Sequence, residues 1–116
     1  MGDVSIYFNP GCTKCRTAWS ILEELGADAE QYRYLDERPT RDDLEHLLVM
    51  LGTDDPRAMV RTGEAVYDDL GLAGAGRDEL LDAMAAHPIL IERPIVIRGD
   101  RAVVARPPER LRDLFS

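Results

Sequence analysis

Long apolar segments, repeats and basic residues are all scarce in this sequence of 116 residues. No apolar run approaches the roughly 20 residues that cross a bilayer, and residues 1–6 lack the basic and apolar stretches of a signal peptide. No internal repeat or low-complexity segment occurs, which argues against a solenoid. We therefore expect a single domain over residues 1–116, with no membrane attachment and a cytoplasmic location.

Basic residues are fewer than acidic ones: the chain has 14 Lys and Arg and 22 Asp and Glu, which gives a formal net charge of −8. Nucleic-acid-binding proteins present a basic face, so we predict no nucleic-acid partner. The same balance disfavours long-range steering of an anion. If the substrate is an anion, a few local cations must hold it.

Cysteine occurs only twice, as Cys12 and Cys15. A structural disulfide is not expected in a cytoplasmic chain. A zinc site would need further Cys or His ligands at suitable spacing, and His46 and His87 are each isolated, so no metal is predicted. The pair therefore indicates redox or nucleophilic chemistry.

Residue patterns in the first part of the chain predict a strand, a helix and a second strand. Residues 4–8 are rich in β-formers, and Asn9-Pro10-Gly11 is a turn sequence. Ala18, Ile21, Leu22 and Leu25 then repeat at helical spacing, with Gly26 placed to end the helix. Residues 31–35 resemble a second strand.

Helices are predicted from residue 40 to residue 86, followed by a hairpin. Thr40 is a good N-cap for a helix that ends near Gly52. Short helices are expected after Pro56 and over residues 64–70, a loop over residues 71–76, and a helix over residues 78–86. Residues 95–97 and 102–104 flank Gly99-Asp100, a hairpin turn, and a short helix carrying Leu111, Leu114 and Phe115 on one face ends the chain.

This order of elements predicts the α/β class. A right-handed βαβ unit joined to an antiparallel hairpin forms a mixed four-stranded sheet with flanking helices. That is the thioredoxin-like arrangement, here with a helical insertion between the βαβ unit and the C-terminal hairpin.

Cys12 stands where a turn opens into a helix, a position that lowers the pKa of a thiol. Lys14 and Arg16 add positive charge nearby. The thiolate is the nucleophilic form, and the unpaired N–H groups of a helix start also bind tetrahedral anions. The alternative is that Cys12 and Cys15 are small residues at a helix start without chemistry.

The chain resembles the glutaredoxin-coupled arsenate reductases on segments that occur in the same order. These segments are IYFNPGCTKCR at residues 6–16, YL at 34–35 with PTRD at 39–42, RAMVR at 57–61 with YDDLGL at 67–72, HPILIERPIV at 87–96, and ARPPE at 105–109. The resemblance covers nearly the whole chain.

The resemblance implies that Cys12 is the nucleophile, which attacks arsenate to form a thiol-linked adduct. It implies that Arg61, Arg93 and Arg106 bind the oxyanion and that Pro94 is cis. Guanidinium groups suit such an anion because each donates two parallel hydrogen bonds. Without the resemblance, each of these arginines would be interpreted as a solvated surface charge. In the family, glutathione and then glutaredoxin reduce the adduct and release arsenite, with no bound cofactor. We expect the chain to be a monomer.

Two positions depart from the family pattern: Cys15 replaces a common Ser, and Phe8 replaces a frequent His. A second thiol one helical turn from Cys12 could resolve an adduct there. Glutathione would then not be required, and thioredoxin or glutaredoxin could regenerate the enzyme.

Two other functions remain open. A redox-sensing transcriptional regulator of the Spx type shares the fold and a similar CxxC segment, binds RNA polymerase and has no substrate. Arg61 with residues 67–72, and Arg106-Pro107, favour the reductase. A generic glutaredoxin-like thiol–disulfide enzyme is the other alternative, and it would have no use for the three arginines.

Overall fold

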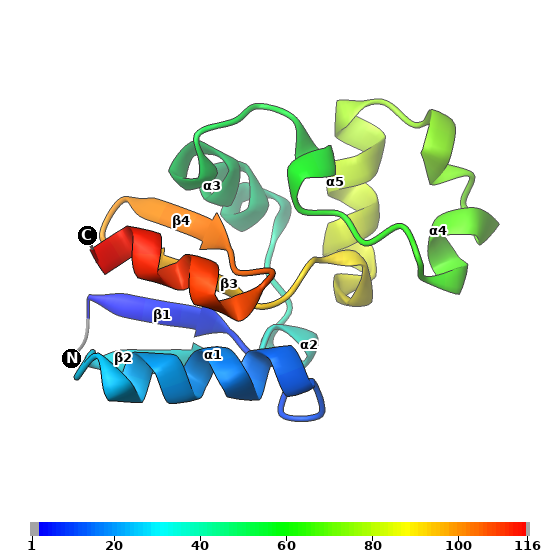
Figure 1. The fold of residues 1–116 in the computed structure, drawn as a ribbon. Coiled ribbons are helices and arrows are strands. Elements are labelled where there is room, and N and C mark those ends of the chain that lie inside the picture. Colours follow the sequence, from blue (N-terminus) through cyan, green and yellow to red (C-terminus); the bar gives the residue numbers. More distant parts are fainter. Residues whose placement is uncertain (1–2, 116) are drawn as a thin grey trace.

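The computed structural model describes residues 3–115 and contains a mixed four-stranded sheet with strand order β2-β1-β3-β4 (Figure 1). The central strand β1 (Val4–Tyr7) pairs in parallel with β2 (Ala29–Tyr32) and antiparallel with β3 (Ile95–Arg98). β3 continues through a hairpin into β4 (Arg101–Val104). The thioredoxin-like sheet predicted from the order of elements is confirmed.

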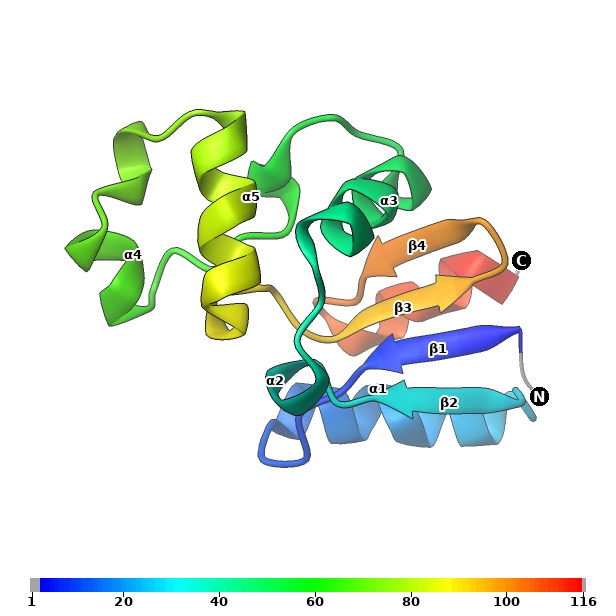
Figure 2. The same ribbon diagram turned by 180° about the vertical axis from the view of Figure 1, so that it is seen from behind.

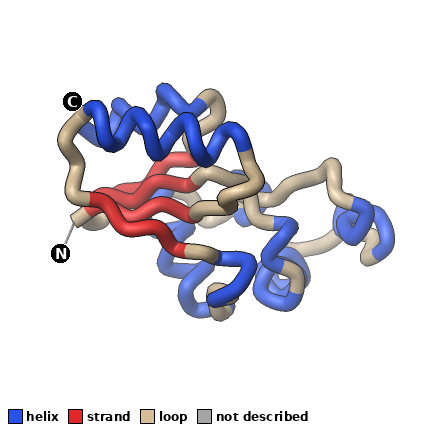
Figure 3. Tube along the Cα trace, turned by 90° about the horizontal axis from the view of Figure 1, so that it is seen from below, coloured by secondary structure: helices blue, strands red, loops and turns tan. Residues whose placement is uncertain are grey.

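Helices cover both faces of the sheet (Figure 3). On one face lie α1 (Thr13–Glu24) and the 3₁₀ helix η4 (Pro108–Phe115), and on the other face lies α3 (Arg41–Leu51). α1 buries residues at helical spacing against the sheet, namely Cys15, Ala18, Ile21 and Leu22. Because neighbouring residues of a strand point to opposite faces, Ile6 belongs to the α1 core and Tyr7 to the core beneath the insertion.

The helical insertion separates β2 from β3 and extends beyond one end of the sheet (Figures 1 and 2). Its elements are α2 (Tyr34–Glu37), α3, η1 (Pro56–Ala58), α4 (Ala65–Asp69), η2 (Leu72–Gly74), α5 (Arg77–Ala86) and η3 (Pro88–Leu90). Arg77 pairs with Glu45 at 2.6 Å, and Arg41 pairs with Asp78 and Asp82. These ion pairs join α3 to α5. None of the helices within residues 3–115 is long and apolar enough to cross a membrane.

A small antiparallel contact closes the base of the insertion. Val60 and Ile91 form an isolated β-bridge. The Arg61 N–H donates to the carbonyl of Leu90 at 2.7 Å, and the Glu92 N–H donates to that of Met59 at 2.8 Å. This contact, called the insertion bridge below, pairs Arg61 with Leu90 and Glu92 with Met59, and the side chains of Arg61 and Glu92 lie 3.6 Å apart across it.

Two of the predicted elements differ from the structure. The second strand was predicted over residues 31–35, but β2 ends at Tyr32 and Tyr34 begins the short helix α2. Tyr34 is only 1% exposed and stacks on Tyr7, so packing in the core overrides its preference for a strand. The predicted loop over residues 71–76 contains η2, which buries Leu72.

Thr40 caps α3 through a reciprocal pair of hydrogen bonds. Its side chain accepts from the Asp43 N–H at 3.1 Å, and its own N–H donates to the Asp43 carboxylate at 2.9 Å. We expect Thr40→Ala to lower the free energy of unfolding by about 1 kcal/mol, measured by urea denaturation. Thr62→Ala, in an exposed turn, is the control. Equal losses in the two variants would contradict the capping role.

Candidate active site

The site lies where the carboxyl end of β1, the start of α1 and the amino end of β3 meet the base of the insertion (Figure 2). The loop before α1 is held by its own polar groups. The Asn9 carbonyl accepts from the Cys12 N–H and its side chain accepts from the Gly11 N–H, each at 2.9 Å. Arg16 donates to the Pro10 carbonyl at 2.8 Å. Its guanidinium thus fastens the loop rather than serving only as a nearby charge.

Cys12 is the N-cap residue of α1, with extended backbone angles of φ −100° and ψ 120°. Its side chain makes no capping hydrogen bond and is 8% exposed. The first N–H groups of a helix lack partners inside the helix and carry partial positive charge. The Cys12 side chain therefore lies at the positive end of α1.

Cys15 lies one turn further along α1 and is fully buried. Burial raises the pKa of its thiol to about 12. The backbone N–H of Asn9 lowers that pKa, and a side-chain hydrogen bond with Cys12 raises it. The Cys15 sulfur also lies 3.9 Å from the Tyr7 carbonyl oxygen. At neutral pH, Cys15 is thus a protonated thiol in contact with Cys12, and both cysteines are free.

The different surroundings of Cys12 and Cys15 predict that an alkylating reagent modifies only one of them in the native protein. Iodoacetamide at pH 7 should modify Cys12 and leave Cys15 unmodified, because Cys15 is buried and its pKa of about 12 leaves almost no thiolate. Peptide mass mapping before and after denaturation measures this. Cys15 should react only in the denatured chain, and labelling of both residues at similar rates in the native protein would contradict the assignment.

Arg93 precedes a cis peptide bond to Pro94 at the start of β3. Its Nε and Nη1 atoms are buried and find no hydrogen-bond partner among residues 3–115. Buried donors are almost always paired, and leaving a charged one unpaired is costly. Two buried, unpaired guanidinium nitrogens at the end of the sheet where α1 begins are the arrangement expected for a site that binds an anion.

Arg106 lies against Arg93. Its Nη1 donates to the Arg93 carbonyl at 2.9 Å, and its charge lowers the pKa of Cys15. The Ala105 N–H donates to the Pro94 carbonyl at 2.9 Å, which ties the segment after β4 to the start of β3. The Arg106–Pro107 peptide bond is also cis.

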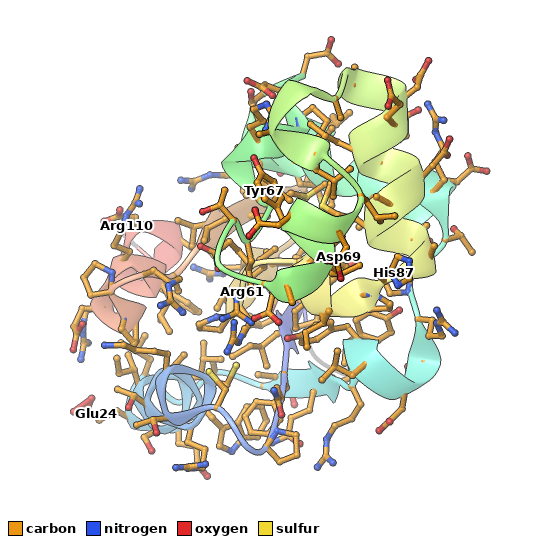
Figure 4. All side chains as sticks on the ribbon, turned by 90° about the vertical axis from the view of Figure 1, so that its right-hand side faces the viewer. Glu24, Arg61, Tyr67, Asp69, His87 and Arg110 are labelled. Atoms are coloured by element: carbon orange, nitrogen blue, oxygen red, sulfur yellow. The ribbon has the colours of Figure 1, made fainter. Side chains whose placement is uncertain are left out.

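Arg61 reaches the same region from the insertion. It forms an ion pair with Glu64 at 2.8 Å and a longer one with Glu92 at 3.6 Å. Figure 4, which views this end of the molecule, shows Arg61 between α4 and the first turn of α1. The structure therefore brings the two cysteines and the three arginines singled out in the sequence to one end of the sheet.

Tyr34 lies among these groups. Burial raises the pKa of its hydroxyl, both cysteines and Glu92 raise it further, and Arg61 lowers it. Its ring stacks on Tyr7 with 5.7 Å between centroids. Sequence reasoning placed Tyr34 in a strand and so missed it.

Sequence reasoning also did not indicate that Glu64 and Glu92 lie at the site. The only signals in the sequence were their positions, three residues after Arg61 and one before Arg93.

Other features lie away from this cluster. Within residues 3–115, no group of three His, Cys, Asp or Glu side chains is placed to hold a metal ion. A cavity of about 500 Å³ opens in the insertion, lined by residues that include Asp54, Arg57 and Arg77. Arg57 donates there to the Tyr67 hydroxyl and to backbone carbonyls, so its role is to hold the insertion together.

Comparisons with known proteins identify the family of the chain. The ArsC family profile matches residues 7–114. An arsenate reductase from Neisseria meningitidis serogroup A is 42% identical over 96% of this chain and 97% of its own. One from Escherichia coli is 35% identical over all of this chain and 83% of its own. The structure of the arsenate reductase from Vibrio cholerae superposes with a TM-score of 0.91, at 40% identity over 95% of both chains. The chain belongs to the ArsC family.

Proposed function

We propose that this protein reduces arsenate to arsenite through an adduct on Cys12. The observation that supports this most directly is the pair of buried Arg93 nitrogens, Nε and Nη1, that have no partner among residues 3–115, at the end of the sheet where Cys12 caps α1. The relatives named arsenate reductase match nearly the whole chain. A site for thiol–disulfide exchange alone would not require buried, unpaired cationic donors.

In the first step, the Cys12 sulfur attacks arsenic, and an arsenate hydroxyl takes up the thiol proton and leaves as water. A sulfur–arsenic bond replaces an arsenic–oxygen bond, and arsenic remains pentavalent. The N–H groups at the start of α1 and the guanidiniums of Arg61, Arg93 and Arg106 bind the remaining oxygens. Donors that are already oriented stabilise the charge that develops on those oxygens without reorganisation.

In the second step, a thiol attacks the Cys12 sulfur, a disulfide forms and the sulfur–arsenic bond breaks. The bonding electron pair stays on arsenic, which leaves as arsenite. We propose Cys15 as this thiol, because its side chain already contacts that of Cys12. The Cys15 proton passes to an arsenite oxygen, so no Cys15 thiolate needs to accumulate.

The Cys12–Cys15 disulfide then needs an external reductant, either thioredoxin or glutathione with glutaredoxin. We propose that the protein works in the cytoplasm, where such thiols are kept reduced. We propose further that it acts as a single-domain monomer, without a bound cofactor or metal.

A coupled assay tests the function and the reductant together. Arsenate-dependent NADPH oxidation is followed with the thioredoxin system or the glutathione and glutaredoxin system supplied separately, and Cys12→Ser is the control. Turnover with either system that is lost in Cys12→Ser supports the proposal. No arsenite with either system would reject it and would favour the regulator that binds RNA polymerase.

A further inference from the structure

We infer that Glu64 and Glu92 act in opposite ways on Arg61: Glu64 orients its guanidinium for the oxyanion, and Glu92 competes with the oxyanion for it. Both are positioning residues, since they act through Arg61. The inference rests on the proposed function, because it assigns a role in binding the anionic substrate of that site.

Glu64 is placed to orient Arg61. It is the N-cap residue of α4, yet its side chain makes no capping hydrogen bond. Its carboxylate instead lies 2.8 Å from Nη1 of Arg61. The Arg61 backbone is held by the insertion bridge, and both side chains are 23% exposed. A half-buried ion pair on a fixed backbone limits the directions that the guanidinium can adopt.

The geometry of the guanidinium then determines which donors remain. A guanidinium offers two edges for bidentate binding, one formed by Nη1 and Nη2 and the other by Nε and Nη2. Glu64 lies 2.8 Å from Nη1, an atom of the first edge. Glu92 lies at the second edge, 3.6 Å from Nε, which is longer than a hydrogen bond. An oxyanion can therefore bind the second edge without displacing Glu64.

Glu92 is a negative charge at that open edge. Its N–H is fixed to the Met59 carbonyl, it directly precedes Arg93, and its charge raises the pKa of Tyr34. Its carboxylate therefore faces the same cluster as the cysteines and repels an incoming anion. Arsenite is uncharged at neutral pH, so after reduction nothing opposes the return of Arg61 to Glu92. Glu92 thus weakens substrate binding but assists release of the product.

Calorimetry in a Cys12→Ser background measures arsenate binding without reaction. We expect Glu92→Gln to tighten binding roughly three- to tenfold, and Glu64→Ala to weaken it by a similar factor. Glu64→Gln keeps an acceptor for Nη1 and should bind more tightly than Glu64→Ala. Glu79→Gln, an exposed change on α5 with the same change in net charge, is the control for long-range electrostatics.

Steady-state kinetics with Cys12 intact provides a second measurement. Glu92→Gln should lower KM and, where product release limits turnover, also lower kcat, whereas Glu64→Ala should raise KM. A purely structural role would move both variants in the same direction. Such parallel shifts, or a Glu92→Gln effect no larger than that of Glu79→Gln, would overturn the inference while arsenate reduction itself persists. If the parent protein neither binds nor reduces arsenate, the proposed function and the inference both fail.

Discussion

Arg93→Lys should lower kcat/KM for arsenate by about 100-fold or more, a loss typical of removing an oriented oxyanion donor. Lysine keeps the charge but loses the planar fork with its fixed donor directions. Two nitrogens of Arg93 are buried without partners among the described residues, so in the free protein their hydrogen-bonding capacity is unused. A reacting oxyanion is the acceptor that would satisfy them.

The matched control is Arg112→Lys, which changes an exposed arginine paired with Glu24 at 3.1 Å. Its kcat/KM should stay within about twofold of wild type, because exposed ion pairs contribute little. Equal kinetics for the two variants would remove Arg93 from the site.

Replacing Arg93 should lower activity without lowering the stability of the fold. Arg93→Met removes donors that are buried and unpaired, so the free energy of unfolding should stay the same or rise by about 1 kcal/mol. Urea denaturation without any anion measures this. A clear loss of stability would show that Arg93 holds the fold together rather than serving the substrate.

Cys12→Ser should abolish arsenate reduction, by at least about 10⁴-fold, because a hydroxyl at this position can neither form the adduct nor provide electrons. Cys15→Ser should act differently. It should leave the attack on arsenate intact and make regeneration depend on added glutathione or a similar small thiol. The contact between the two side chains supports this division of roles.

Mass spectrometry of the protein after one exposure to arsenate, with no external thiol, separates the two roles. We expect a loss of two hydrogens, a peptide that links Cys12 to Cys15, and one arsenite per chain. The Cys15→Ser variant should show no such link. Two free thiols and no arsenite in the wild-type protein would reject Cys15 as the resolving residue.

Local sequence patterns account well for the part of the site that lies in one segment. The turn at residues 9–11 and the apolar spacing along α1 predict that Cys12 begins a helix, and the structure has it as the N-cap. The three arginines of the site cannot be predicted in this way, because no local sequence pattern distinguishes an arginine with buried, unpaired nitrogens from a solvated one. Resemblance to the arsenate reductases selected them, and only the folded chain shows that Arg106 contacts Arg93.

The surroundings of Arg61 depend on contacts between distant segments. The insertion bridge joins residues 59–61 to residues 90–92, which lie far apart in the sequence. Tyr34 illustrates the same limit, since its aromatic neighbours suggested a strand but stacking on Tyr7 places it in a helix. Periodicity within one segment cannot reveal such pairings.

The insertion bridge also defines where this fold tolerates change in length. The bridge holds residues 59–61 and 90–92 together, so the chain between them leaves and returns at the same place. Residues 73–76 lie near the middle of this segment, and three of these four residues are exposed. Doubling the length of a flexible loop costs only about 0.6 kcal/mol in closure entropy. Extra residues grafted at residues 73–76 should therefore leave Arg61 and Arg93 in place, so this position is a suitable site for adding a recognition element for a chosen reductase.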